Sequence, residues 1–358
     1  MTPARHPALD GHQAALRSIA RVVDETAPLQ DPETASRGLL RLMEESRPLV
    51  ITGAGVSTDS GIPDYRGPNG SLHRHRPMTY QEFRDDPAAR HRYWARSFVG
   101  WRRMDQARPN EAHRILARWA AEGRIAGVLT QNVDGLHAEA GRAAGMPEDR
   151  LIELHGDLAR VACLNCGATE SRRDLDLRLE AANPGYLERV AIDPDAVNPD
   201  GDVSLDQHWV EEFTMVGCRV CGSVKLKPDV VYFGESVPPA RRAAAEAMAD
   251  DGGTVLAVGT SLAVMSGYRF VLRAERAGHA TGLINLGVGM VAVVDPEVAA
   301  KSISVLVDAG IDAWEMGTIG ALSVDAAAAG LDFVQDAKAR WRWRAPVADA
   351  LAWLDARL

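Results

Sequence analysis

The sequence predicts an α/β fold: a Rossmann-like doubly wound parallel sheet with a smaller zinc-binding domain and a helical insertion. Three observations support this prediction. Short apolar runs alternate with helical stretches, as in a parallel sheet covered by helices. The first run ends in the turn Gly53-Ala54-Gly55, which is typical of the opening of a nucleotide-binding unit. All four cysteines fall in two Cys-x-x-Cys pairs, a spacing that favours a metal site.

The elements of the main sheet follow from apolar spacing. Residues 34–47 have the spacing of a helix with one apolar face, and residues 48–51 form a short apolar run directly before the glycine turn. Further buried strands are expected at residues 125–129, 254–258 and 281–285, each of which ends in a polar or glycine-rich segment.

Two segments interrupt this alternation and set the expected domain boundaries. Residues 67–108 are rich in histidine, arginine and aromatic residues and are expected to form a helical insertion. Residues 157–227 carry the cysteines and a middle rich in proline, aspartate and asparagine, and are expected to form the zinc-binding domain. The expected division is an N-terminal extension at 1–33, a discontinuous Rossmann-like domain at 34–66, 109–156 and 228–317, and a C-terminal helical tail at 318–358.

Composition narrows the class of protein. A formal net charge of −9 argues against a general nucleic-acid binder, which would show a basic balance. No run approaches the roughly 20 apolar residues of a membrane-spanning helix, so no membrane partner is expected. The first residues contain Asp10, Asp24 and Glu25 and lack an apolar signal core. We therefore expect a cytoplasmic protein.

The cysteine pairs are expected to hold one structural zinc ion. Each pair is followed by a glycine, Gly167 or Gly222, which lets backbone amides approach the thiolate sulfurs. Four thiolates close the tetrahedral shell of zinc, whereas a catalytic zinc keeps a position open. A redox dithiol and unpaired core cysteines are the alternatives, and the duplicated pattern disfavours both. The expected ligands are Cys163, Cys166, Cys218 and Cys221.

Polar clusters at strand ends indicate a ligand site, because open α/β sheets bind ligands there. The loop after the first strand continues to residue 67 as a polar segment punctuated by proline and glycine, with no evident packing role. Residues 130–137 form a second cluster, in which His137 is expected to be structural. His155 stands between the two expected domains, and a histidine can accept a proton from a sugar hydroxyl near neutral pH.

Together these motifs resemble the sirtuin family of NAD-dependent protein deacylases. They occur in the family's order over residues 35–287. The matching segments are residues 53–66, 131–134 (Gln-Asn-Val-Asp), 153–156 (Glu-Leu-His-Gly), both cysteine pairs, 228–235 (Pro-Asp-Val-Val-Tyr-Phe-Gly-Glu), 259–262 (Gly-Thr-Ser-Leu) and 284–287 (Ile-Asn-Leu-Gly).

The resemblance implies a reaction and a role for each motif. NAD would be a co-substrate lying across residues 53–66, and acyl-lysine proteins or peptides would pair with residues 230–234 as an added strand. The acyl oxygen would attack the ribose carbon as nicotinamide leaves. His155 would then deprotonate a ribose hydroxyl that attacks the acyl carbon, giving free lysine and O-acyl-ADP-ribose.

The implied site residues fall into three groups. The catalytic group is His155, Asn132 and Asp134, and the substrate group is Tyr93, Arg96, Val230, Val231, Tyr232, Phe233 and Gly234. The cofactor group is Gly53, Ala54, Gly55, Ser57, Asp59, Ile62, Pro63, Asp64, Tyr65, Arg66, Gln131, Asn132, Asp134, Gly259, Thr260, Ser261, Asn285, Leu286 and Gly287.

Within the family, residues 92–101 and 198–203 resemble the class II branch, which includes a mitochondrial lipoamidase and ADP-ribosyltransferase. Tyr93 and Arg96 have the Tyr-x-x-Arg spacing that reads an acyl carboxylate in desuccinylating relatives, because arginine pairs well with carboxylates. The alternative is a helix face with Arg96 in solvent. The functional alternative predicts a preference for carboxylated acyl groups, and the branch likeness extends the expectation to long acyl groups.

The family resemblance stops near Gly287, where a short loop, a last strand and a helix are expected. Residues 287–317 instead resemble the C-terminal end of aminoimidazole ribonucleotide synthetase, which suggests a fusion, recombination or chimera. A divergent tail is the alternative, with residues 307–310 as the last strand. Trp341, Trp343 and Trp353 predict an amphipathic terminal helix.

Two other functions use the same residues. A protein nucleophile in place of the acyl oxygen would make the chain a mono-ADP-ribosyltransferase. An altered tail that disables turnover would leave a non-catalytic module that binds NAD or acyl-peptide.

Overall fold

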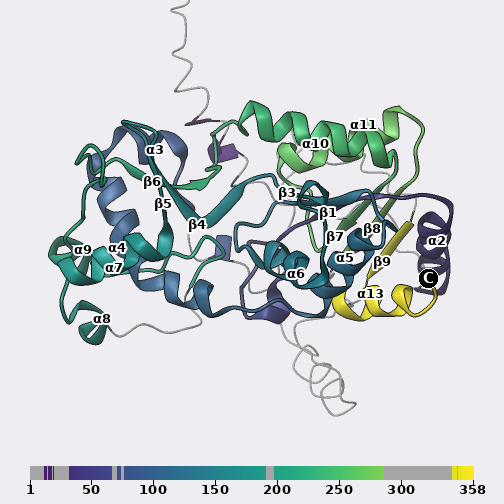
Figure 1. Ribbon diagram of the computed structural model, residues 1–358, viewed down its shortest axis with the longest axis horizontal. Helices are drawn as coiled ribbons and strands as arrows, with labels where there is room; N and C mark the ends of the chain where they lie inside the picture. The colour runs from purple at the N-terminus through teal and green to yellow at the C-terminus, as the bar shows by residue number, and fades with distance from the viewer. Residues whose placement is uncertain are drawn as a thin grey trace, which may run out of the picture.

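The computed structural model describes residues 12–13, 15–17, 19, 32–66, 71–73, 76–190, 197–285, 341–344 and 346–358. A large lobe and a small lobe lie side by side along the long axis of the molecule (Figure 1). The large lobe is built on a six-stranded sheet in which every neighbouring pair is parallel. Its strand order is β3 (Leu151–Glu153), β2 (Gly127–Thr130), β1 (Leu49–Thr52), β7 (Val255–Val258), β8 (Thr281–Asn285) and β9 (Trp341–Arg344).

Strand β1 shows why this sheet forms. All four of its residues are buried, as expected for a central parallel strand with helices on both faces. Successive side chains alternate between faces, so Val50 joins one apolar cluster while Leu49 and Ile51 join the other. The first face is covered by α2 (Pro32–Glu45), α5 (Glu111–Ala121) and α13 (Val347–Asp355), and the second by α10 (Pro239–Gly252) and α11 (Met265–Arg276). The expected Rossmann-like doubly wound sheet is confirmed.

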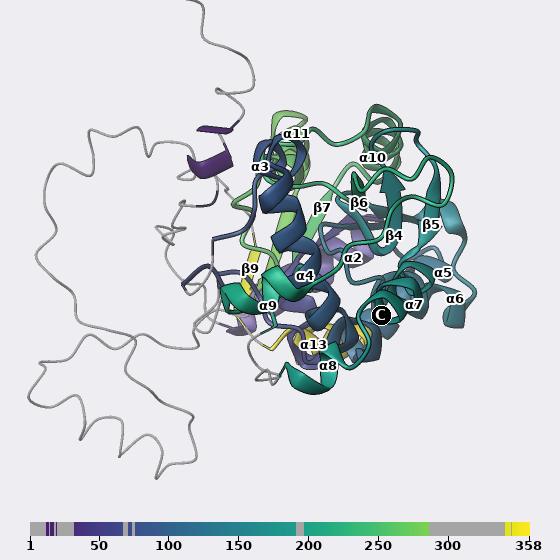
Figure 2. The same cartoon turned by 90° about the vertical axis from the view of Figure 1, so that its left-hand side faces the viewer.

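The small lobe is built on a three-stranded antiparallel sheet with the order β5 (Thr169–Ser171), β4 (Gly156–Cys163), β6 (Leu226–Val230). The segment expected as a helical insertion contains α3 (Tyr80–Asp85) and α4 (Pro87–Gln106), and one apolar cluster joins these helices to the small sheet. Figure 2 shows α4 beside that sheet. The remaining helices of this lobe are α7 (Arg172–Ala182), α8 (Tyr186–Arg189) and α9 (Gln207–Glu212).

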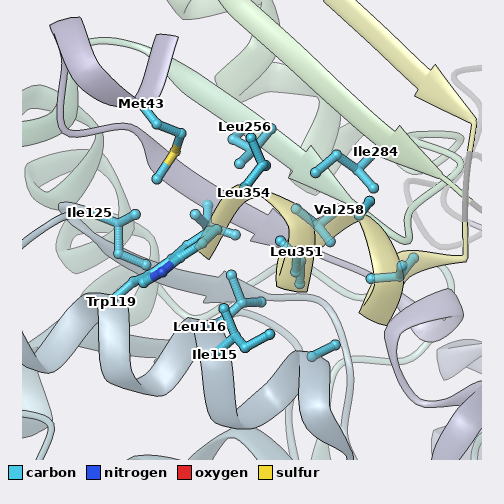
Figure 3. Close-up of a cluster of buried hydrophobic side chains, with 14 of the residues drawn as sticks. Met43, Ile115, Leu116, Trp119, Ile125, Leu256, Val258, Ile284, Leu351 and Leu354 are labelled. Carbon is cyan, nitrogen blue, oxygen red and sulfur yellow. The ribbon is translucent and has the colours of Figure 1, made fainter. Parts of the chain in front are cut away.

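The C-terminal segment corrects the expectation of a separate helical tail over residues 318–358. Trp341 and Trp343 lie in strand β9, which pairs with β8 and extends the main sheet. The Trp-Arg-Trp-Arg alternation has the period of a strand, and only the residues after Pro346 have helical spacing. These residues form α13, and Leu351 and Leu354 are fully buried against α5 (Figure 3). The Rossmann-like domain therefore includes β9 as the last strand of its sheet and α13 as a helix that covers it.

Strand β6 runs to Val230 and so crosses the domain boundary expected after residue 227. The segment that resembles the synthetase, together with residues 307–310, Leu286 and Gly287, lies outside the described residues. Among the helices of the described part, none has the length and hydropathy needed to cross a membrane.

Candidate active site and zinc site

Two glycine loops at the carboxyl ends of β1 and β7 pack directly against each other. Gly55 donates its backbone N–H to the carbonyl of Gly259 at 2.9 Å. A Cβ on Gly55 would lie 2.9 Å from that same oxygen, and a Cβ on Gly53 would lie 2.7 Å from Cβ of Thr260. Gly259 has φ +58°, a left-handed conformation that disfavours side chains. The close contact between the two loops thus requires glycine at positions 53, 55 and 259, all of which were expected at the cofactor.

The short 3-10 turn Ala54–Val56 leads from these glycines to Ser57, which is completely buried. Ser57 Oγ donates to Asp134 Oδ2 at 2.7 Å and accepts from Asn132 Nδ2 at 3.0 Å. His113 Nε2 lies 3.4 Å from the same oxygen. The structure therefore brings together three residues that were expected at the cofactor, from two loops 75 or more positions apart in sequence.

Asp134 also accepts the backbone N–H of Leu136, the first residue of α6 (Leu136–Ala144), at 3.0 Å. Burial raises the pKa of this carboxyl, and the hydrogen bonds from Ser57 and Leu136 oppose that rise. The arrangement ties the end of the Gln-Asn-Val-Asp motif to the glycine loop.

The rest of the expected cofactor loop folds back under the first glycines. Ile62 donates its N–H to the carbonyl of Ser57 at 3.2 Å, and its side chain is buried in a cluster with Trp101 and Val230. Asp64 and Tyr65 accept backbone N–H groups from Ser71 and Leu72. Asp59 is exposed, and Pro63 and Arg66 are partly exposed members of the same loop.

His155 lies just after β3 with both ring nitrogens occupied. Nδ1 lies 2.9 Å from the carbonyl oxygen of Gln131, and Nε2 lies 2.7 Å from Ser266 Oγ. A carbonyl can only accept, so Nδ1 carries the proton and Nε2 carries the lone pair. Burial lowers the pKa of His155 to about 4, with a smaller lowering from the charge of Arg241. The ring is neutral near pH 7 and can accept a proton.

The segment expected to bind substrate continues from β6 beside His155. Val231 donates its N–H to the carbonyl of His155 at 2.8 Å. Phe233 forms a parallel bridge with Thr79, and its carbonyl accepts the N–H of Tyr80 at 2.9 Å. Residues 230–234 therefore run between His155 and the start of α3, with Tyr232 and Gly234 inside the segment.

Tyr93 and Arg96 lie on α4 at the inner side of the small lobe. Tyr93 is buried, with its ring centroid 5.8 Å from that of Tyr232. Arg96 Nη1 lies 3.8 Å from Asp202 Oδ2, and the Arg96 side chain is only 16% exposed. Neither expected alternative describes Arg96 fully, because it is out of solvent and already has an acidic partner.

The adenosine-side residues are only partly described. Gly259 donates its N–H to the carbonyl of Ile284 at 2.8 Å, which joins this loop to the end of β8. Thr260 Oγ1 donates to the side-chain oxygen of Gln131 at 2.9 Å, and Ser261 follows at the partly buried turn. Asn285 is the last residue of β8.

The four cysteines converge at the end of the small lobe. Their sulfur atoms all lie within 4.8 Å of one another, and the Cys163–Cys221 and Cys166–Cys218 pairs are both 3.7 Å apart. Tetrahedral zinc with bonds of about 2.3 Å places its sulfurs about 3.8 Å apart, whereas a disulfide needs about 2.0 Å. The residues fit one structural zinc, and none of the four is disulfide-bonded.

Two contributors to the site, His113 and Ser266, were not predicted from the sequence. His113 and His137 stack with centroids 4.6 Å apart, and His137 Nε2 lies 3.0 Å from Thr52 Oγ1. Burial lowers the pKa of His137 to about 4, which fits the structural role expected for it. Ser266 had no sequence signal, because its contact with His155 spans 111 positions.

Comparisons with known proteins agree with this geometry. The model of the Sir2 family matches residues 53–266, more than half of the 358 residues. NAD-dependent protein deacetylase 1 of Corynebacterium efficiens is 57% identical over 255 residues, covering 71% of this chain and 89% of that protein. NAD-dependent protein deacetylase 1 of Streptomyces coelicolor is 51% identical over 237 residues, covering 66% of this chain and 76% of the relative.

Solved structures show the same similarity. A Sir2 enzyme superposes with a TM-score of 0.53 at 27% identity, covering 71% of this chain and 87% of the other. A Sir2 homologue in complex with NAD superposes with a TM-score of 0.50 at 29% identity, covering 70% and 82%. The chain therefore belongs to the Sir2 family of enzymes.

Proposed function

We propose that the protein is an NAD-dependent protein-lysine deacylase with His155 as its general base. The observation that carries this proposal is the state of the His155 ring, whose Nδ1–H is held by the Gln131 carbonyl so that Nε2 keeps its lone pair. The named relatives are NAD-dependent protein deacetylases, and one similar structure holds a deacetylated p53 peptide with 3′-O-acetyl ADP ribose.

The residues present fit NAD. The two glycine loops lie at the carboxyl ends of β1 and β7, where open α/β sheets bind nucleotides. The polar atoms of Asn132 and Asp134 converge on Ser57 behind the first loop. When bound, NAD supplies the ribose carbon from which nicotinamide leaves. Ser57 holds Asn132 and Asp134 in place for that end of the site.

The chain's own residues then handle the peptide and the proton. Residues 230–234 pair with the substrate backbone as an added strand, a mode that provides affinity without strict sequence reading. His155 Nε2 takes the proton of a ribose hydroxyl, and the freed oxygen attacks the acyl carbon. With nicotinamide released earlier and one water molecule consumed in breaking the bond between the acyl carbon and the lysine nitrogen, free lysine and O-acyl-ADP-ribose would result.

The acyl preference is a finer proposal that centres on Arg96. We propose membership of the class II branch from the likeness of residues 92–101 and 198–203 to that branch. The two segments pack on each other, since a Cβ on Gly100 would lie 2.5 Å from the carbonyl of Gly201. Asp202 already pairs with Arg96, and burial together with Asp202 raises the pKa of Asp200 well above its usual value. A carboxylated acyl group must therefore compete with Asp202 for Arg96.

Asp202→Asn tests this competition. The substitution frees Arg96, so the ratio of kcat/KM for glutaryl-lysine over acetyl-lysine peptide should rise about tenfold, as expected for one charged hydrogen bond. Asp105→Asn removes a half-exposed carboxylate elsewhere on α4, one that pairs with Arg173 and not with Arg96, and serves as the matched control. An unchanged ratio in Asp202→Asn would mean that Arg96 does not read the acyl group.

Nicotinamide release from NAD, measured with acetyl-, glutaryl- and lipoyl-lysine peptides, tests the function itself. Release should depend on the acyl-peptide, and His155→Ala should lower turnover about a hundredfold or more. Transfer of label from NAD onto protein would instead support mono-ADP-ribosyl transfer. Tight NAD binding without turnover would support a non-catalytic module.

A further inference from the structure

The hydroxyl of Ser266 occupies the one acceptor position of the proposed base. A neutral imidazole with its proton on Nδ1 has a single lone pair on Nε2. Ser266 Oγ lies 2.7 Å from that nitrogen, so the serine hydroxyl donates and the nitrogen accepts. A sugar hydroxyl cannot donate to the same lone pair until the serine hydroxyl has turned away.

The position of Ser266 is built into the fold through Gln131. The backbone carbonyl of Gln131 holds Nδ1 of His155, while its side-chain oxygen accepts from Thr260 Oγ1. Gly267, next to Ser266 in the first turn of α11, sits directly on the same glutamine. A Cβ at Gly267 would lie 2.7 Å from the Gln131 side chain.

The backbone before α11 is also specified. Leu262 has φ +53°, the only positive φ of a non-glycine residue among those described, and its N–H donates to Thr260 Oγ1 at 3.1 Å. A positive φ at a leucine costs free energy and persists where the surroundings impose it. This turn directs the chain into α11, so that Ser266 faces His155.

From this geometry we propose that Ser266 is a positioning residue for the base. Its hydroxyl holds the imidazole ring from the Nε2 side while the Gln131 carbonyl holds it from the Nδ1 side, and the sugar hydroxyl replaces Ser266 when substrate is bound. The inference rests on the proposed role of His155.

The hydrogen bond from Ser266 should affect the pKa of His155 and so the pH profile of turnover. A hydroxyl can donate only to the unprotonated nitrogen, so this hydrogen bond stabilises the neutral ring alone. The charge of Arg241 of α10, which pairs with Asp229 of β6 at 3.3 Å, also lowers the pKa of His155 and so disfavours protonation of the ring. Removing the Ser266 hydroxyl should make the ring easier to protonate.

The experiment compares Ser266→Ala, Ser266→Thr and Met265→Ala in the full chain. Nicotinamide release with acetyl-lysine peptide is measured between about pH 4 and pH 8, where the acid limb of kcat/KM reports the pKa of the base. We expect the limb in Ser266→Ala to move up by about half to one pH unit, the value of one neutral hydrogen bond. Ser266→Thr keeps a hydroxyl and should restore the original limb, and the exposed neighbour Met265→Ala should not move it.

Two outcomes would overturn the proposal: an acid limb in Ser266→Ala that coincides with the unsubstituted enzyme, or a shift that Ser266→Thr fails to reverse. If Ser266→Ala is too unstable to assay, the imidazole ¹⁵N shifts of His155 in the unsubstituted protein decide instead. They should show Nδ1 protonated and Nε2 accepting a hydrogen bond, and a freely exchanging tautomer would refute the arrangement. His155→Ala in the same assay separates the two ideas, since retained turnover there refutes the base itself.

Discussion

Truncation of Leu354 to alanine tests whether the C-terminal helix is part of the main fold. Leu354 is 0% exposed, and Figure 3 shows it beside Trp119 of α5 and Leu256 of β7. The next residue, Asp355, accepts from Trp119 Nε1 at 2.9 Å and from Arg118 Nη2 at 2.6 Å. Together these contacts place the end of the chain across residues more than 200 positions earlier.

The loss in the free energy of unfolding expected for Leu354→Ala follows from the complete burial of this side chain. Leu→Ala removes three carbon atoms from water-free surroundings, which costs about 2.5 kcal/mol in transfer free energy, and the cavity left behind adds to it. We expect a loss of about 3 kcal/mol in the free energy of unfolding. For a chain of 358 residues that corresponds to a fall in Tm of about 4 °C.

Urea unfolding followed by circular dichroism measures this loss, with Ala352→Ser as the control. Ala352 is an exposed residue of the same helix, so its substitution should cost no more than about 0.5 kcal/mol. If Leu354→Ala were as stable as Ala352→Ser, α13 would not be packed on the sheet, and the reasoning about the C-terminus would be refuted.

Three further predictions concern the rest of the molecule. Chelation of zinc should unfold the small lobe and abolish turnover, because the four cysteines join the end of β4 to the loop before β6. A near-native circular dichroism spectrum of the metal-free protein would contradict this prediction. Gly55→Ala should raise KM for NAD about tenfold or more, since the new Cβ meets the Gly259 carbonyl at 2.9 Å, and an unchanged KM would show that the loops can separate freely. The free energy of unfolding should fall as pH decreases from about 6.5 to about 4, because burial lowers the pKa of His137 to about 4 and the unfolded chain therefore takes up its proton first. His137 alone should account for about 3 kcal/mol of this fall. The variant His137→Gln should lose that part of the pH dependence.

Local sequence patterns were enough to predict much of the main sheet. The apolar runs at residues 125–129 and 254–258 lie within a residue or two of β2 and β7, and the run at 281–285 coincides with β8. Periodicity reports which residues are buried in a strand, so these predictions needed no knowledge of neighbouring strands. Strand β9 was not predicted because Trp341, Trp343 and Trp353 were all assigned to one amphipathic helix. Two of them follow the period of a strand and the third follows that of a helix.

The candidate site likewise has features that local motifs predicted and features that depend on tertiary contacts. The motifs indicated a cofactor role for Gly53, Gly55 and Gly259. The reason why these positions need glycine is the backbone contact between two loops, and that contact exists only in the folded chain. The pairing of Arg96 with Asp202 was not predicted, because it joins a helix to a distant loop and neither residue is unusual locally.

The sequence alone determined the parallel sheet and the set of four candidate zinc ligands, because each depends on spacing or residue chemistry along a short stretch. His155 was indicated as the candidate base by its place between the two expected domains together with the family resemblance. Tertiary structure decided which proton His155 carries, which hydroxyl meets its lone pair, and that the chain returns after residue 340 to complete the sheet. Those features come from contacts between residues tens to hundreds of positions apart. Such contacts are set by the balance of burial and hydrogen bonding over the whole chain, which no local pattern contains.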